Sequence, residues 1–125
     1  MSSQVATADA RRRRVLTIGV GLLVGSLIPS PFERHDAFDR YGPDKGLHFL
    51  GHGAFAATLA DALAADGRAG PISGGAGAVC GSVLLGLGVG YLQRYVPGRV
   101  PELADLVAGA LGSILGVCWW YRRGG

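Results

Sequence analysis

Four long apolar stretches, separated by short polar connectors, dominate the pattern of this 125-residue chain. The stretches cover residues 15–28, 46–65, 72–92 and 101–121, and the connectors cover residues 30–45, 66–71 and 93–100. Each of the last three is long enough for a helix to cross a hydrocarbon layer of about 30 Å. The first spans only about 21 Å as a helix, so it must continue toward Phe32 or let Arg14 snorkel. Because backbone amides in lipid must be satisfied within a segment, the pattern predicts helices.

The composition agrees with a membrane location. Hydrophobic residues make up 49% of the chain, charged residues only 17%, and the mean hydropathy is positive. Small soluble domains rarely have so few charges. We therefore expect an all-α fold, namely an integral membrane four-helix up-and-down bundle over residues 15–121, preceded by a basic tail over residues 1–14.

Glycine is abundant in the apolar stretches. The 22 glycines lack the three-residue period of collagen and lie among Leu, Val and Ala, so they do not indicate a linker. Small residues four positions apart allow membrane helices to approach closely. We predict helix packing at four such pairs: Gly21/Gly25, Gly77/Gly81, Gly86/Gly90 and Gly112/Gly116.

Basic residues predict the orientation and exclude one class of partner. The formal charge is +3, but the twelve Lys and Arg residues fall at segment ends without forming a basic helix stripe, so we expect no nucleic acid. The run Arg11 to Arg14 resembles the start of a signal peptide, but no clean small-residue cleavage site follows, which favours an uncleaved helix. With the N-terminus inside, seven Lys and Arg residues (11–14, 68, 122, 123) lie inside and five (34, 40, 45, 94, 99) outside. This excess predicts a multi-pass cell-membrane protein with a cytoplasmic basic tail and both termini in the cytoplasm.

Two further features of the apolar stretches carry expectations. Trp119, Trp120 and Tyr121, followed by two arginines, predict an aromatic belt at the end of the fourth helix. Cys80 and Cys118 each lie alone in an apolar stretch. We expect them to be small buried apolar side chains rather than parts of a disulfide or a metal site.

Polar residues gather where the second predicted helix starts, the third ends and the fourth starts, which is one membrane boundary in an up-and-down bundle. Residues 44, 48 and 52 share one helix face because they are four positions apart. Several of these polar residues should project near the apolar layer, where polar groups are costly and usually face a partner or a cavity. The candidate binding cluster comprises Asp44, Lys45, His48, His52, Gln93, Arg99 and Asp105.

Each of these residues also has a simpler explanation. Asp44 suits a helix N-terminus, while Lys45 and Arg99 suit headgroup anchors. Asp44 and the two histidines could converge on a metal ion, but two histidines on one helix are a weak signal without a third ligand at a known distance. We predict neither a metal nor a cofactor.

In their order along the chain, these residues resemble the pattern of the VanZ-like family of membrane proteins. That pattern pairs an Asp-Lys-x-x-His-Phe helix start with Glu-x-x-Gln and Pro-Gly-Arg at a helix end, then Asp-Leu and Gly-x-x-x-Gly. The resemblance covers residues 44–116, and the matching positions are Asp44, Lys45, His48, Phe49, Gln93, Pro97, Gly98, Arg99, Asp105, Leu106, Gly112 and Gly116. Three positions depart from it, about one turn deeper in the membrane: Gly90 stands where Glu is usual, His52 where Tyr is common, and Gly109 where Asn is common.

The resemblance implies an integral membrane protein of the cell envelope, with glycopeptide antibiotic resistance as the association of the founding member, and it supplies no established reaction. Our leading hypothesis is a non-enzymatic protein whose outer-face cluster binds an anionic or amphiphilic envelope component, with Lys45 and Arg99 as anion contacts. The alternative is a membrane hydrolase acting on a lipid-linked envelope substrate, with His48 or His52 as general base. Against it, the sequence has no nucleophile elbow and no zinc-binding His-Glu-x-x-His motif. A third hypothesis is a structural helix bundle, as a homo-oligomer or a subunit of a larger complex.

Overall fold

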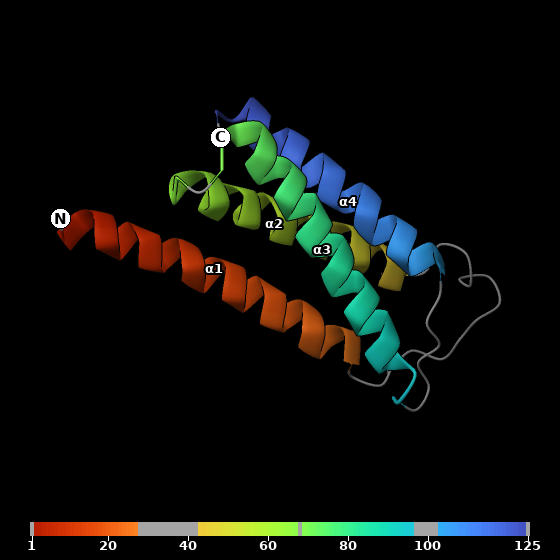
Figure 1. Ribbon diagram of the computed structural model, residues 1–125. Helices are drawn as coiled ribbons and strands as arrows, with labels where there is room; N and C mark the ends of the chain where they lie inside the picture. Colours follow the sequence, from red (N-terminus) through yellow and green to blue (C-terminus); the bar gives the residue numbers. More distant parts are fainter. Residues whose placement is uncertain (1, 28–42, 68, 97–102, 125) are drawn as a thin grey trace.

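Four helices that run in alternating directions make up the fold (Figure 1). The computed structural model describes residues 2–27, 43–67, 69–96 and 103–124. The elements are α1 (Ser2–Leu27), α2 (Pro43–Ala65), α3 (Pro71–Gln93) and α4 (Leu103–Arg122). These residues include no strand, so the predicted all-α class is confirmed. The start of α1 and the end of α4 lie at one end of the bundle, whereas α2 and α4 start at the other end, where α3 finishes (Figure 1).

The basic N-terminal segment differs from the prediction, because it is helical and continuous with the apolar part of α1. Ala, Gln and Arg are good helix formers, so the segment has the composition of a helix start rather than of a separate tail. Two of its arginines also pair with acids near the end of α2. Arg11 Nε lies 3.1 Å from Asp61 Oδ2, and the Arg12 guanidinium lies 3.8 Å from Asp66 Oδ2. Ion pairs, as well as apolar contacts, therefore join α1 to the bundle.

Glycines bring α2 and α4 into the most extensive helix contact of the fold. A Cβ added at Gly112 would overlap the backbone carbonyl oxygen of Phe49. A Cβ at Gly116 would overlap that of Gly53, and a Cβ at Gly53 would lie 2.9 Å from the carbonyl oxygen of Gly112. Any side chain at these positions would hold the two backbones apart, which is the reason small residues occur at close helix crossings.

The other glycines predicted to pack helices have looser surroundings. Three of them face side chains of neighbouring helices rather than backbone, namely Gly77, Gly81 and Gly86. At three more, a Cβ would meet no described atom within 4 Å, namely Gly21, Gly25 and Gly90. The prediction of close contact between the described helices is wrong at these last three, because they line cavities instead.

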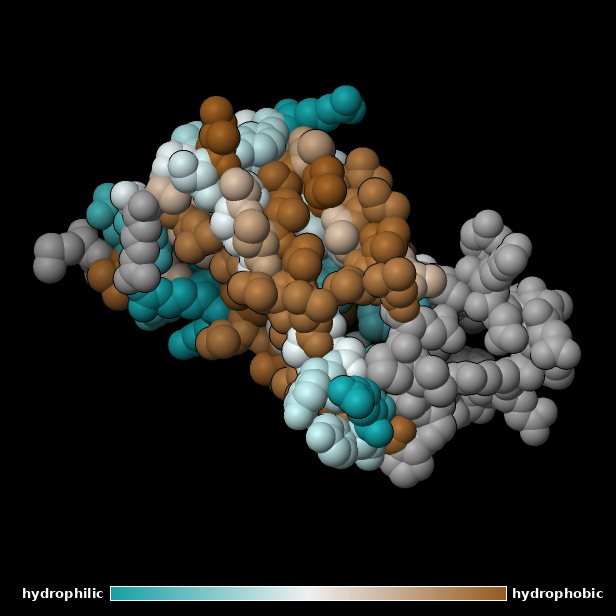
Figure 2. Space-filling view, turned by 45° about the vertical axis from the view of Figure 1, so that its right-hand side comes forward, coloured by the Kyte–Doolittle hydropathy of each residue, from teal (hydrophilic) through white to brown (hydrophobic). Residues whose placement is uncertain are grey.

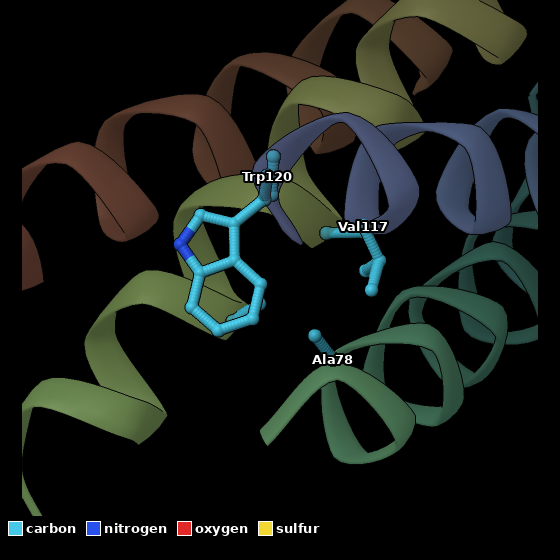
Figure 3. Packing of buried hydrophobic residues seen from close by; sticks show 6 residues of the cluster. Ala78, Val117 and Trp120 are labelled. Atoms are coloured by element: carbon cyan, nitrogen blue, oxygen red, sulfur yellow. The ribbon is translucent and has the colours of Figure 1, made fainter. Parts of the chain in front are cut away.

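Small side chains fill the apolar core, which lies nearer the end of the bundle where α4 finishes. The core consists of Ala56, Ala57, Ala60, Ala78, Val117 and Trp120. Figure 3 shows Ala78 of α3 and Val117 of α4 facing one another beside the Trp120 ring. Alanines leave little side-chain volume between the helices, so the core requires close helix approach as well.

Two expectations about individual side chains are wrong. Trp120 is only 6% exposed and belongs to the core. The Tyr121 hydroxyl donates a hydrogen bond to the backbone carbonyl of Pro71. Of the three residues of the predicted aromatic belt, Trp119 is therefore the one that faces outward. Cys80 and Cys118 are exposed rather than buried. Both cysteines lie on helix faces that point away from the core. An apolar residue in an apolar helix therefore need not be buried, because the outward face of such a helix can also be apolar.

Among the described helices, α3 and α4 are long and apolar enough to cross a membrane. In each, only 28% of the apolar stretch is buried inside the molecule, unlike the core helix of a soluble protein. The remaining side chains face outward, and Figure 2 shows a broad band of hydrophobic residues on one face with hydrophilic residues toward its margins. The other two helices fall short, because α1 contains four arginines and α2 contains two histidines and an aspartate.

Candidate functional site

A cavity of about 380 Å³ lies between α2, α3 and α4, toward the end of the bundle where α4 begins. Its apolar wall includes Leu87, Leu103 and Leu106. Its polar lining residues are His48, His52, Ser82, Gln93, Arg94 and Asp105. The cavity is therefore amphiphilic, with apolar side chains from α3 and α4 and polar side chains from all three helices.

His48 and Asp105 form a pair between α2 and α4. His48 Nε2 lies 3.9 Å from Asp105 Oδ2, and the His48 side chain is buried. Asp105 lies in the first turn of α4, where the helix macrodipole favours a carboxylate. One turn along α2, the His52 ring stacks on the His48 ring with centroids 6.1 Å apart and planes 17° from parallel. The predicted shared face of the two histidines thus points into the bundle.

His52 begins a chain of buried hydrogen bonds that joins all three helices. His52 Nδ1 lies 2.8 Å from Ser82 Oγ, Ser82 Oγ lies 2.7 Å from Ser113 Oγ, and Ser113 Oγ lies 2.7 Å from the carbonyl oxygen of Gly109. Both serines are completely buried. The Ser113 hydroxyl is the donor toward both the Gly109 carbonyl oxygen and Ser82 Oγ, and Ser82 Oγ also bonds to His52 Nδ1. The chain therefore holds the His52 ring of α2 against the serines of α3 and α4.

Two glycines make room for the His52 ring. A Cβ at Gly109 of α4 would lie 3.0 Å from His52 Cδ2, and a Cβ at Gly86 of α3 would lie 3.4 Å from His52 Cε1. The first distance is shorter than real Cβ contacts normally allow. His52 and Gly109 are therefore a matched pair, because the imidazole occupies space that a side chain at position 109 would need.

Gln93 and Arg94 bring the end of α3 to the cavity. Gln93 is 4% exposed, and its Nε2 donates a 3.0 Å hydrogen bond to the carbonyl oxygen of Ser26, near the end of α1. Gln93 thus ties α1 to α3 while also lining the cavity. Arg94 is exposed and its guanidinium lies 5.9 Å from the centroid of the Tyr91 ring, so it supplies a positive charge at the rim.

The structure brings four of the seven predicted cluster residues to this one cavity: His48, His52, Gln93 and Asp105. Asp44 and Lys45 lie in the first turn of α2, but their side chains are outside the described residues, as is Arg99 altogether. Three residues at or beside the cavity are not among the predicted cluster: Arg94, Ser82 and Ser113. Ser113 had a signal, since it is an isolated hydroxyl in the run from Leu106 to Val117, and polar groups inside such a run usually have partners.

The cavity does not combine enough ligand side chains for a metal. Within the described residues, no group of three or more His, Cys, Asp or Glu side chains could hold a metal ion. The polar groups instead bond to one another, and every buried side-chain nitrogen or oxygen of the described chain has a hydrogen-bond partner.

Fold and site together define a small all-helical bundle with an amphiphilic cavity between three helices and with outward apolar faces on α3 and α4. Comparisons with protein-family models, with curated proteins and with solved structures find no match to this chain. The resemblance to VanZ-like proteins therefore stays a prediction based on the sequence pattern.

Proposed function

We propose that this chain is a small polytopic membrane protein of the VanZ-like type that binds an anionic, amphiphilic component of the cell envelope in the cavity between α2, α3 and α4. The observation that carries the proposal is the amphiphilic lining of that cavity. Leucines of α3 and α4 provide a wall for an apolar chain, while Arg94 provides a cation at the rim for an anionic head. Lys45 and Arg99 are the anion contacts predicted from the sequence, and their side chains lie outside what the structure describes.

The membrane location is supported by the outward apolar faces of α3 and α4. A bundle in lipid needs such faces, and it also needs its polar side chains turned inward or placed at the ends. The second condition agrees with the burial of the hydrogen-bonded side chains of His52, Ser82 and Ser113. With the excess of arginines at the end where α1 begins and α4 finishes, we place both termini in the cytoplasm and the cavity toward the outer face.

Binding fits the geometry better than hydrolysis does. In a hydrolase, a histidine would accept the proton of a serine nucleophile. Here the Ser82 hydroxyl is completely buried between His52 and Ser113, so a substrate cannot reach it. The chain of hydrogen bonds therefore fixes the histidine in place rather than activating a serine.

A cavity-filling substitution tests the proposal. Gly90 lines the cavity and a Cβ there would meet no described atom within 4 Å, so Gly90→Leu would project into the ligand volume. Gly21→Leu is the matched control, because Gly21 also has open space but lies on α1 beside a different cavity. Binding would be measured by native mass spectrometry of the detergent-solubilised full chain with a polyprenyl phosphate or phosphatidylglycerol as probe. We expect Gly90→Leu to abolish binding and Gly21→Leu to retain it.

Charge is tested in the same assay. Arg94→Gln should weaken binding of the anionic probe about tenfold, the value of one charge-assisted contact. Arg122→Gln removes the same charge at the opposite end and should change binding less than twofold. Wild-type binding by both Gly90→Leu and Arg94→Gln contradicts the proposed site. Release of a cleaved lipid product, lost in His52→Gln, would instead support the hydrolase.

A further inference from the structure

A second cavity, of about 410 Å³, lies toward the opposite end of the bundle, between α1, α2 and α4. Its lining includes three arginines and one acid, namely Arg11, Arg14, Arg123 and Asp61, together with Trp119. Three positive charges against one negative charge leave a net charge of +2 around a concave space. None of these residues takes part in the cavity described above.

Contacts within the protein hold two of the arginines in place. Arg11 uses its Nε on the Asp61 carboxylate, at 3.1 Å, which leaves its terminal N–H groups available to a second acceptor. The Arg123 guanidinium lies over the Trp119 ring, 4.9 Å from its centroid. A guanidinium held in this way loses less conformational entropy when it binds an anion.

An apolar surface continues from this cavity toward the middle of the bundle. Trp119 is 54% exposed, and Leu115, one turn earlier on the same face of α4, is 56% exposed. A ligand with a phosphate among the arginines could therefore lay an acyl chain along α4. Guanidinium groups match phosphate oxygens in geometry as well as in charge.

We propose that this cavity between α1, α2 and α4 is a binding site for the phosphate group of an anionic membrane phospholipid, contacted by Arg11, Arg14 and Arg123. The site is separate from the ligand cavity near His52 and does not depend on the function proposed for that cavity. It would fix the depth and the orientation of the bundle through a bound lipid rather than through diffuse attraction between arginines and the membrane surface.

The test uses charge-matched variants of the full chain in detergent. Arg14→Gln and Arg123→Gln each remove a cavity-lining charge, whereas Arg13→Gln and Arg122→Gln remove neighbouring charges that do not line the cavity. Native mass spectrometry would measure retention of phosphatidylglycerol and of zwitterionic phosphatidylcholine. We expect wild type to prefer phosphatidylglycerol, Arg14→Gln and Arg123→Gln to weaken its binding about tenfold, and the two control variants to change it less than twofold.

Three outcomes would overturn the proposal. Equal losses in all four variants would show diffuse electrostatic attraction instead of a site. No loss in any variant would show that the arginines do not contact the lipid. Displacement of the lipid by inorganic phosphate at equimolar concentration would show a site for free phosphate, because a phospholipid site gains affinity from its acyl contacts.

Discussion

The close crossing of α2 and α4 predicts that a single methyl group at Gly112 destabilises the protein. An alanine Cβ at this position would lie 2.8 Å from the carbonyl carbon of Phe49, which is 0.6 Å short of the 3.4 Å at which ordinary contacts begin. The neighbour is backbone, so it cannot rotate away, and the two helices must separate. Such overpacking costs about 1–3 kcal/mol, while the better helix propensity of alanine returns roughly 0.5–1 kcal/mol. The expected net loss of unfolding free energy is about 0–2.5 kcal/mol relative to wild type, and about 1–3 kcal/mol relative to an alanine placed where it meets no neighbouring atom.

The assay is equilibrium unfolding by sodium dodecyl sulfate in mixed micelles, followed by circular dichroism. Gly21→Ala is the control, because its Cβ would meet no described atom within 4 Å and only the gain in helix propensity remains. We expect Gly21→Ala to be as stable as wild type or slightly more stable. Equal stability of Gly112→Ala and Gly21→Ala would refute the inference that backbone contact between α2 and α4 holds the fold together.

Two further predictions concern contacts between helices. Gly109→Ala should destabilise the protein by about 1–3 kcal/mol, because the added methyl group pushes against the His52 ring. In the background of His52→Ala most of that penalty should disappear, so a double-mutant cycle would show a coupling of about 0.5–3 kcal/mol. Additive effects of the two substitutions would show that the two residues do not interact. Arg11→Ala and Asp61→Ala should show a coupling below about 1 kcal/mol in unfolding experiments, since their side chains are 37% and 41% exposed; a larger coupling would mean that the pair is shielded from water in the bilayer.

The order of the helices and their approximate extents could be predicted from hydropathy alone, because long apolar runs interrupted by Pro, Gly and charged residues leave few alternatives. The start of α1 could not. Apolar pattern marks only the part of a helix that faces lipid or core, so it missed the helical residues from Ser2 to Arg14, whose contacts with α2 are ionic.

The candidate site was predicted in part. Topology places helix ends together, and that was enough to bring His48, Gln93 and Asp105 to one cavity. Which glycines pack backbone to backbone depends on helix rotation, which spacing does not determine: Gly112 and Gly116 contact the α2 backbone, whereas Gly21 and Gly25 line a cavity beside α2. Helix rotation also decides that Ser82 lies opposite His52, which the spacing could not show.

The crossing of α2 and α4 also constrains how the chain can assemble during synthesis. The two helices with the most extensive contact, α2 and α4, are separated in the sequence by α3. Their contact can therefore form only after both α3 and α4 have been made. Until then Gly53 lacks its backbone contact with Gly112, and His52 lacks one of the two helices that enclose it. A chain stopped after α3 would thus keep three helices without their main partner, so the bundle described here can close only once α4 has been made.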